Sequence, residues 1–234
     1  MIAETVFKSF DSTVELETQL AKRIANQLQD AVDIRGRASL VVSGGSTPLK
    51  LFERLSEQAI DWSDVYITLA DERWVELYDK DSNEALVRAN LLQGLASNAK
   101  FCGLKNMYTS PEEGAAMTSE SLAHFPRPFD VVILGMGNDG HTCSWFPCAK
   151  EAELSQALES SAMCCAVNPV SAPHPRITLT RAAVLNSRQI YLHLVGDSKL
   201  SVYRQALSSD DIHAMPIRAV LAQHKTPVDV YWSA

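Results

Sequence analysis

A carboxylate and an imidazole lie two residues apart in a glycine-rich segment, Leu134-Gly-Met-Gly-Asn-Asp-Gly-His-Thr-Cys-Ser-Trp-Phe-Pro147. These groups belong to Asp139 and His141, and the apolar run 129–134 before them predicts a buried strand. A neutral imidazole can take a proton from water near pH 7, and a carboxylate can fix its tautomer and stabilise the imidazolium. The segment therefore predicts general-base chemistry at the end of a buried strand.

The same segment also has a competing interpretation. Its pattern Gly135-x-Gly137-x-x-Gly140 matches the dinucleotide-binding fingerprint, which needs a following helix and an acidic residue roughly 20 positions on. Pro147 follows too soon for a regular helix, and Glu159 precedes the next apolar run instead of ending it. The context therefore favours a turn that presents Asp139 and His141 over a nucleotide cradle.

A second candidate segment is Ser43-Gly-Gly-Ser-Thr-Pro48, which follows the predicted buried strand 39–42 and precedes a predicted helix. Free backbone N–H groups, short hydroxyl donors and the positive end of a helix dipole suit a phosphate. The candidate phosphate ligands are Ser43, Gly44, Gly45, Ser46 and Thr47. The segment lacks the Gly-Lys-Ser/Thr ending of a Walker A loop, and taken alone it is equally compatible with an ordinary turn.

Charged side chains supply the remaining candidates. Asp71-Glu-Arg-Trp-Val75 follows the predicted strand 65–70, and Arg73 can clamp a phosphate or carboxylate in bidentate fashion. Asp71 can act as an acid or base or can orient Arg73; a solvated loop with a local ion pair is the alternative. Arg176 opens a predicted strand, and Lys199 lies at a strand-to-helix junction, where an ammonium can meet a phosphate or simply face solvent.

Several chemistries lack their usual motifs. The sequence contains no Cys-x-x-Cys and no His-Glu-x-x-His pattern, so a metal site is disfavoured. It contains no Gly-x-Ser-x-Gly nucleophile elbow, so water is favoured over a side chain as the nucleophile. His193 alternates with apolar residues inside a predicted strand and is interpreted as a packed or edge residue.

Composition narrows the class of protein further. The chain has 234 residues, of which 46% are hydrophobic, and its formal net charge is −7. This charge argues against nucleic-acid or anionic-membrane binding but allows an anionic small molecule to bind to a few focused cations. The sequence has no apolar run of about 18 residues and no signal-peptide pattern. The five cysteines therefore predict free thiols in a reducing cytoplasm.

Strand and helix patterns alternate along the chain, which predicts βαβ units. Strands are expected at 5–9, 39–42, 65–70, 129–134, 176–180, 189–195 and 227–232, and helices at 12–36, 48–55, 83–95, 110–122, 197–207 and from 216. We expect one domain over residues 1–234, with an α/β, Rossmann-like, mostly parallel sheet, helices on both faces and room for a small additional β lobe. The carboxyl ends of parallel strands share one edge, so the candidate segments can converge there.

Five motifs in order over nearly the whole chain resemble the 6-phosphogluconolactonase family, which shares a superfamily with glucosamine-6-phosphate isomerase/deaminase. They occupy residues 43–48, 71–75, 134–147, 175–180 and 196–199. The resemblance implies hydrolysis of 6-phospho-D-glucono-1,5-lactone to 6-phospho-D-gluconate in the oxidative pentose phosphate pathway. It implies a small phosphorylated sugar lactone as the partner, no cofactor and no metal; a monomer and a homodimer are both compatible.

The resemblance also implies roles for residues. His141 would activate water and Asp139 would orient it. The substrate-binding set would be Ser43, Gly44, Gly45, Ser46, Thr47, Asp71, Arg73, Arg176 and Lys199. Cys143 and Trp145 depart from the Ala and Leu of many lactonases, but neither change touches the proton chemistry.

Two alternatives stay open. A glucosamine-6-phosphate deaminase would carry a glutamate where this chain has Phe146 and an aromatic residue where it has Arg73. A non-catalytic sugar-phosphate sensor would bind a phosphosugar without turnover, and such sensors usually carry a fused DNA-binding segment, which this sequence does not show.

Overall fold

Seven parallel strands form the central sheet of the computed structural model, which describes residues 5–234. The strands are β1 (Thr5–Phe10), β2 (Ala38–Val42), β3 (Val65–Leu69), β5 (Lys100–Cys102), β6 (Val131–Leu134), β9 (Ile190–Val195) and β10 (Val228–Ser233). Their order is β1-β10-β9-β6-β2-β3-β5, and every neighbouring pair is parallel. The central strands β2 and β6 are buried along their whole length, as their continuous apolar sequences predict.

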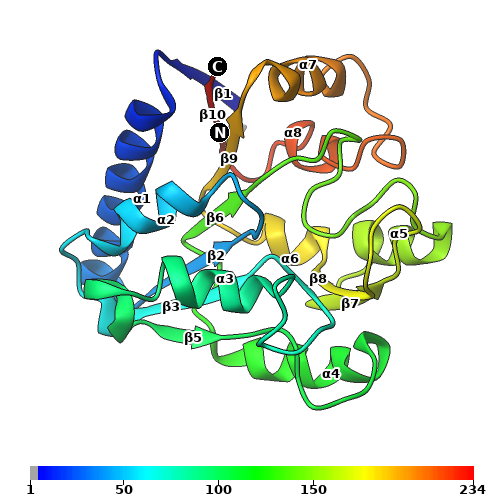
Figure 1. Cartoon of the computed structure of the whole chain (residues 1–234), viewed down its shortest axis with the longest axis horizontal. Helices are drawn as coiled ribbons and strands as arrows, with labels where there is room; N and C mark the ends of the chain where they lie inside the picture. The colour runs from blue at the N-terminus through cyan, green and yellow to red at the C-terminus, as the bar shows by residue number, and fades with distance from the viewer. Residues whose placement is uncertain (1–4) are drawn as a thin grey trace.

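Helices cover both faces of this sheet, as expected for crossover connections between parallel strands. They are α1 (Thr13–Arg35), α2 (Leu49–Ser56), α3 (Asn83–Asn90), α4 (Pro111–Ser121), α5 (Glu151–Glu159), α6 (Arg181–Leu185), α7 (Asp197–Ala206) and α8 (Arg218–Leu221). Figure 1 shows α1 and α2 on one side of the sheet and α5, α6 and α8 on the other. The predicted α/β, Rossmann-like fold with a mostly parallel sheet is confirmed.

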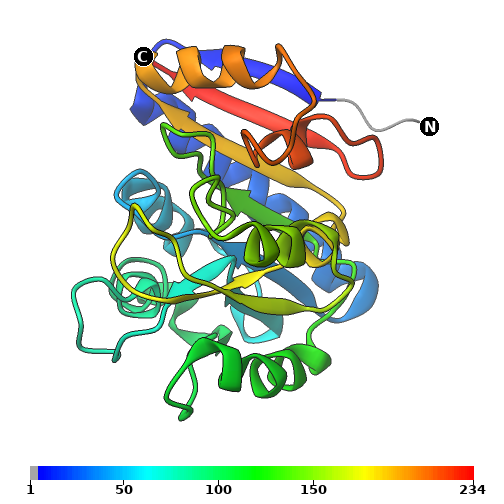
Figure 2. The same cartoon turned by 90° about the vertical axis from the view of Figure 1, so that its right-hand side faces the viewer.

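A second, antiparallel sheet lies beside the first and corresponds to the expected small β lobe (Figure 2). It contains β4 (Asp71–Arg73), β8 (Arg176–Leu179) and β7 (Cys164–Val167), in the order β4-β8-β7. The segment 71–75 was expected to be a loop, and this was wrong for its first three residues. Its charged sequence does not look like a buried strand, but Asp71 and Glu72 are buried because each accepts hydrogen bonds from groups within the protein.

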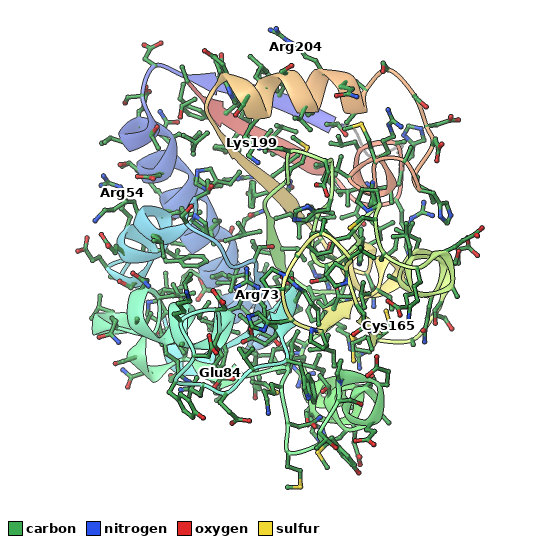
Figure 3. The ribbon with its side chains drawn as sticks, turned by 45° about the vertical axis from the view of Figure 1, so that its right-hand side comes forward. Arg54, Arg73, Glu84, Cys165, Lys199 and Arg204 are labelled. Atoms are coloured by element: carbon green, nitrogen blue, oxygen red, sulfur yellow. The ribbon has the colours of Figure 1, made fainter. Side chains whose placement is uncertain are left out.

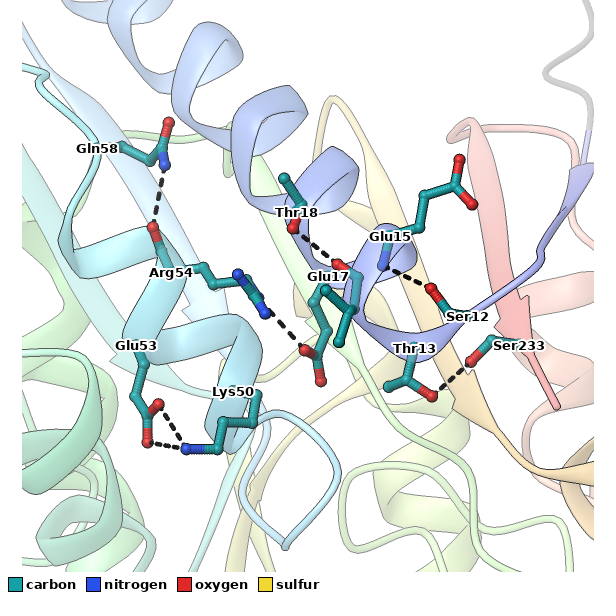
Figure 4. Close-up of polar contacts among 11 residues, drawn as sticks. Ser12, Thr13, Glu15, Glu17, Thr18, Lys50, Glu53, Arg54, Gln58 and Ser233 are labelled. Carbon is teal, nitrogen blue, oxygen red and sulfur yellow. Dashed lines mark hydrogen bonds and ion pairs between the residues drawn. The ribbon is translucent and has the colours of Figure 1, made fainter.

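Helix α1 shows how local sequence signals fix an element. The Oγ of Ser12 accepts a hydrogen bond from the backbone N–H of Glu15, and Gly36 ends the helix with φ 71°. The buried Glu17 pairs with Arg54 of α2 at 3.4 Å, which ties the two helices together on their shared face of the sheet (Figure 4). Ser12 and Gly36 thus cap the two ends of the helix expected at 12–36.

Some element boundaries differ from the prediction. Helix α3 ends at Asn90 and not at Leu95, because the segment Gly94–Asn98 forms a 3₁₀ turn that begins with Gly94 at φ 50°. Asp197 is the first residue of α7 and does not cap it; Gly196, at φ 93°, occupies the cap position. The short strand β5 and the helices α5 and α6 were not predicted.

Candidate active site

The predicted motifs converge at one edge of the central sheet. The strands β9, β6, β2 and β3 are consecutive neighbours, and the segments that follow them open into a cleft of about 250 Å³. Ten of the predicted site residues line this cleft: Ser43, Gly44, Gly45, Ser46, Thr47, Asp71, Arg73, His141, Arg176 and Lys199. Asp139, the eleventh, contacts His141 directly. The structure therefore brings the whole predicted set together, while the role of each residue stays a prediction.

Asp139 and His141 form a hydrogen-bonded pair. His141 Nδ1 lies 2.6 Å from Asp139 Oδ1, and the backbone N–H of His141 donates to the same oxygen at 3.2 Å. Partial burial alone would raise the pKa of Asp139, but the hydrogen bond and the charge of His141 outweigh it and lower that pKa. An ionised Asp139 accepts a hydrogen bond from the Nδ1–H of His141. In this tautomer Nε2 carries no proton and can act as a base.

Glycine is required in the turn that holds this pair. Gly137 donates its backbone N–H to the carbonyl of His141 at 2.8 Å, and Gly140 adopts φ 79°. A Cβ on Gly137 would lie 2.1 Å from His141 Nδ1 and 2.6 Å from Asp139 Oδ1. Helix α5 begins only at Glu151, so the helix that a dinucleotide fingerprint requires does not follow this turn.

Phe146 packs against the catalytic candidate. Its ring stacks on that of His141 with a centroid distance of 4.1 Å and an interplanar angle of 28°. The guanidinium of Arg176 lies 5.1 Å from the centroid of the same ring. Phe146 thus holds the imidazole and a cation in place at once.

The segment between β2 and α2, which was predicted to bind a phosphate, is a turn fixed by hydrogen bonds to β6 and by two glycines. Ser43 donates both its backbone N–H and its hydroxyl to the carbonyl of Ile133, each at 3.1 Å, which anchors the segment to β6. Gly45 has φ 92°. A Cβ on Gly44 would lie 1.8 Å from Asn83 Oδ1, so only glycine fits against that side chain. The start of α2 supplies the positive end of a helix dipole at this turn.

Two arginines line the opposite wall. Arg73 and Arg176 are direct partners in the β4–β8 pairing, so their side chains emerge on the same face of the small sheet. Arg176 Nη1 lies 3.8 Å from Asp71 Oδ2, and Ser144 donates its hydroxyl to that oxygen at 2.5 Å. Arg73 donates to the carbonyl of Asp81 at 2.5 Å. Within residues 5–234 the Nε atoms of both arginines are buried and have no hydrogen-bond partner.

Lys199 supplies a cation at the other end of the cleft. Its Nζ donates to Asn138 Oδ1 at 2.8 Å, which links α7 to the glycine-rich turn. Burial lowers the pKa of Lys199, and the nearby charge of Asp139 opposes this effect. Figure 3 shows Lys199, which belongs to α7, well apart from Arg73, which lies near Glu84 of α3. Both cations line the cleft.

Sequence reasoning missed three buried polar residues of this region. Asn83 and His193 line the cleft, and the buried Glu72 stands between two lining residues, Asp71 and Arg73, in the sequence. The carboxylate of Glu72 accepts hydrogen bonds from the backbone N–H groups of Arg73, Asn83 and Glu84 at 2.7–2.8 Å. It therefore joins β4 to the first turn of α3. The sequence offered one signal for Glu72, which is its position between two candidate ligands, Asp71 and Arg73.

A substitution of Glu72 tests whether this buried side chain stabilises the link between β4 and α3. Burial raises the pKa of Glu72 from 4.5 to about 7, against the lowering effect of its three N–H donors. Between pH 4.5 and pH 7 the folded protein binds more protons than the unfolded chain. The contribution of Glu72 to the free energy of unfolding is therefore complete below pH 4.5 and is lost as the pH rises through 7. The loss corresponds to about 3 kcal/mol. We expect Glu72→Gln, which cannot ionise, to lack this dependence when urea unfolding is compared at pH 5 and pH 8.

The exposed Glu57→Gln is the matched control for that experiment and should follow the wild-type dependence on pH. Equal pH dependence in wild type and Glu72→Gln would contradict the assignment of a raised pKa to Glu72.

Two further findings concern the described part of the chain. Among residues 5–234 no group of three or more His, Cys, Asp or Glu side chains is placed to hold a metal ion. No helix in that range combines the length and the apolar sequence needed to cross a membrane.

The parallel sheet, the histidine–carboxylate pair and the cationic cleft are together typical of an α/β enzyme. Residues 11–232 match the family model described as glucosamine-6-phosphate isomerases/6-phosphogluconolactonase. The chain belongs to this family.

Individual relatives match over nearly the full chain. A 6-phosphogluconolactonase of Mesorhizobium japonicum is 41% identical, covering 97% of this chain and 94% of that protein. A 6-phosphogluconolactonase of Pseudomonas aeruginosa is 40% identical, covering 94% of this chain and 92% of that protein. The crystal structure of a 6-phosphogluconolactonase from Shewanella baltica is 73% identical, with a TM-score of 0.97 and complete coverage of both chains.

Proposed function

We propose that the protein hydrolyses 6-phospho-D-glucono-1,5-lactone to 6-phospho-D-gluconate, a step of the oxidative pentose phosphate pathway. The observation that carries this proposal is the His141–Asp139 pair, joined at 2.6 Å and set in a cleft with three cationic side chains. Relatives named 6-phosphogluconolactonase at 40–73% identity support the same activity.

His141 is the general base in the proposed mechanism. Its Nε2 removes a proton from a water molecule as the water oxygen attacks the lactone carbonyl carbon. The carbonyl oxygen gains negative charge, which backbone N–H groups of the glycine turn or an arginine stabilise. The protonated His141 then donates its proton to the ring oxygen as the carbon–oxygen bond of the ester breaks. Asp139 stabilises the imidazolium between these two steps.

Residues on different walls of the cleft bind different parts of the substrate in this proposal. Ser43, Gly44, Gly45, Ser46 and Thr47 offer donors beside the start of α2, and Lys199 and Arg176 add positive charge for the phosphate. Asp71 and Arg73 lie where sugar hydroxyls or the developing oxyanion can reach them. Binding energy from the phosphate would hold the lactone carbonyl beside His141.

Deaminase activity is the second candidate, and Phe146 separates the two. Ring opening followed by enolisation needs several proton-transfer groups, whereas lactone hydrolysis needs one base and a charge clamp. In this structure an apolar ring stacks directly on His141 at 4.1 Å, at the position where the resemblance leads us to expect a glutamate in a deaminase. This contact favours the lactonase, and a non-catalytic phosphosugar sensor has no comparable feature in its favour.

The same proposal takes residues 1–234 as one domain that acts in the cytoplasm without a cofactor or metal, as a monomer or homodimer. The free state of the five cysteines, Cys102, Cys143, Cys148, Cys164 and Cys165, supports a reducing compartment.

The decisive experiment measures two activities on one preparation. Freshly generated lactone is assayed for acid release, with spontaneous hydrolysis subtracted, and glucosamine 6-phosphate is assayed for ammonia release. We expect rapid lactone hydrolysis and no deamination. Deamination alone would establish the second candidate, and phosphosugar binding without either turnover would establish the sensor.

A further inference from the structure

His193 is a buried histidine that the proposed mechanism does not use. It lies on β9, its exposed fraction is 3%, and within residues 5–234 neither ring nitrogen has a hydrogen-bond partner. Burial lowers its pKa to about 4, so the ring is neutral near pH 7 and carries one N–H donor and one acceptor. The earlier interpretation as a packed or edge residue was incomplete, because β9 is an interior strand and His193 lines the cleft.

The strand register explains why this ring meets the cleft. Leu192 pairs with Leu134 of β6, so Gly135 continues the register beside His193. Gly135 has no side chain, and nothing lies within 4 Å of the place where its Cβ would be. On the other side, Tyr231 of β10 is the direct partner of His193. The side of the ring toward β6 is therefore left uncovered by the neighbouring strand.

An unpaired buried imidazole is costly, and this cost argues for a ligand. Buried polar groups are paired in the great majority of cases, since a buried donor or acceptor without a partner loses its hydration without compensation. A histidine that served only packing could be replaced by an apolar residue without that loss. Lys199 follows six residues later and lines the same cleft, so β9 and its extension place a neutral donor and a cation on one wall.

We propose that His193 is a substrate-binding residue that donates a ring N–H to an oxygen atom of the bound phosphosugar, at the Lys199 end of the cleft. The inference rests on the proposed function, because it takes the cleft as the phosphosugar site. The accepting oxygen belongs to the phosphate or to a sugar hydroxyl. Both are oxygen acceptors within one molecule, and the experiment separates them.

The test follows the ring nitrogens of His193 directly. The intact protein, labelled with ¹⁵N at histidine, is titrated with 6-phosphogluconate, gluconate and inorganic phosphate, and His193→Leu identifies the resonance. We expect 6-phosphogluconate to shift the His193 ring signals. A matching shift with inorganic phosphate assigns the contact to the phosphate, and one with gluconate assigns it to a hydroxyl.

Kinetics provide a second readout. We expect His193→Leu to raise KM for the lactone about tenfold, as for the loss of one hydrogen bond of about 1.4 kcal/mol, with a much smaller change in kcat. The amide of Asn can replace Nδ1 and that of Gln can replace Nε2, so one of His193→Asn and His193→Gln should restore KM. The exposed His224→Gln is the matched control.

The outcomes separate the two proposals. If 6-phosphogluconate shifts the ring signals of His141 but leaves those of His193 unchanged, the inference is overturned and the proposed function stands. An unchanged KM in His193→Leu also overturns it. If 6-phosphogluconate shifts no cleft resonance and the lactone is not hydrolysed, the proposed function itself fails.

Discussion

His141→Ala is expected to lower kcat/KM for lactone hydrolysis by about 10³-fold, within the range of about 10² to 10⁴ that a positioned general base supplies. The variant loses the group that removes a proton from water and later returns one to the ring oxygen. Nothing else in the pair can substitute, because Asp139 faces the Nδ1 side of the ring. Stopped-flow or pH-indicator assays with freshly generated lactone measure the effect once spontaneous hydrolysis is subtracted.

Two comparisons make this result specific. The exposed His124→Ala is the matched histidine control and should retain full activity. Asp139→Asn keeps the shape but removes the charge that stabilises the imidazolium, so it should lower kcat much more than it raises KM. A wild-type rate in His141→Ala would remove His141 from the mechanism.

Gly137→Ala is expected to reduce kcat by about 10²-fold, although it removes no functional group. The added Cβ would lie 2.1 Å from His141 Nδ1, a distance that forces the ring or the turn to move. A displacement of about 1 Å in a reacting group can cost about 10²-fold in rate. Steady-state kinetics measure the loss, and thermal unfolding checks that the protein remains folded.

Gly135→Ala is the matched substitution in the same turn. Nothing lies within 4 Å of the place where its Cβ would be, and its φ is not in the left-handed region, so the His141–Asp139 pair should keep its geometry and kcat should change little. Because Gly135 lines the cleft, any effect of the added methyl group is expected in KM. Equal losses in Gly135→Ala and Gly137→Ala would show that the turn tolerates no side chain at all, and the specific contact with His141 would lose its support.

Much of this site was predictable because it is organised by the edge of a parallel sheet. The segments 43–48, 71–75 and 134–147 each follow a strand that reads as an apolar run, and parallel strands deliver their carboxyl ends to one edge. Residue types that suit phosphate binding and proton transfer were therefore recognisable before their distances were known. The contact between Asp139 and His141 is local in sequence, which made it the safest part of the prediction.

The parts that could not be predicted depend on pairings between distant segments. Strand β4 has three residues and three charges, so it has no apolar period of its own and forms only because β8, about a hundred residues later, pairs with it. Asn83 and His193 gain their place in the cleft from a helix start and a strand register. Neither residue is surrounded in sequence by others of similar chemistry, so no local pattern marks it.

Arg73 and Arg176 both face the cleft only because β4 and β8 pair in one particular register, so the positive charge of the cleft depends on that register. Side chains alternate between the two faces of a strand, so a slip of one residue in either β4 or β8 would turn its guanidinium to the opposite face of the small sheet. A single-residue insertion or deletion within β4 or β8 should therefore damage ligand binding more than one in the connecting segment 168–175. In evolutionary terms, length variation should be tolerated in that connection and selected against in these two strands.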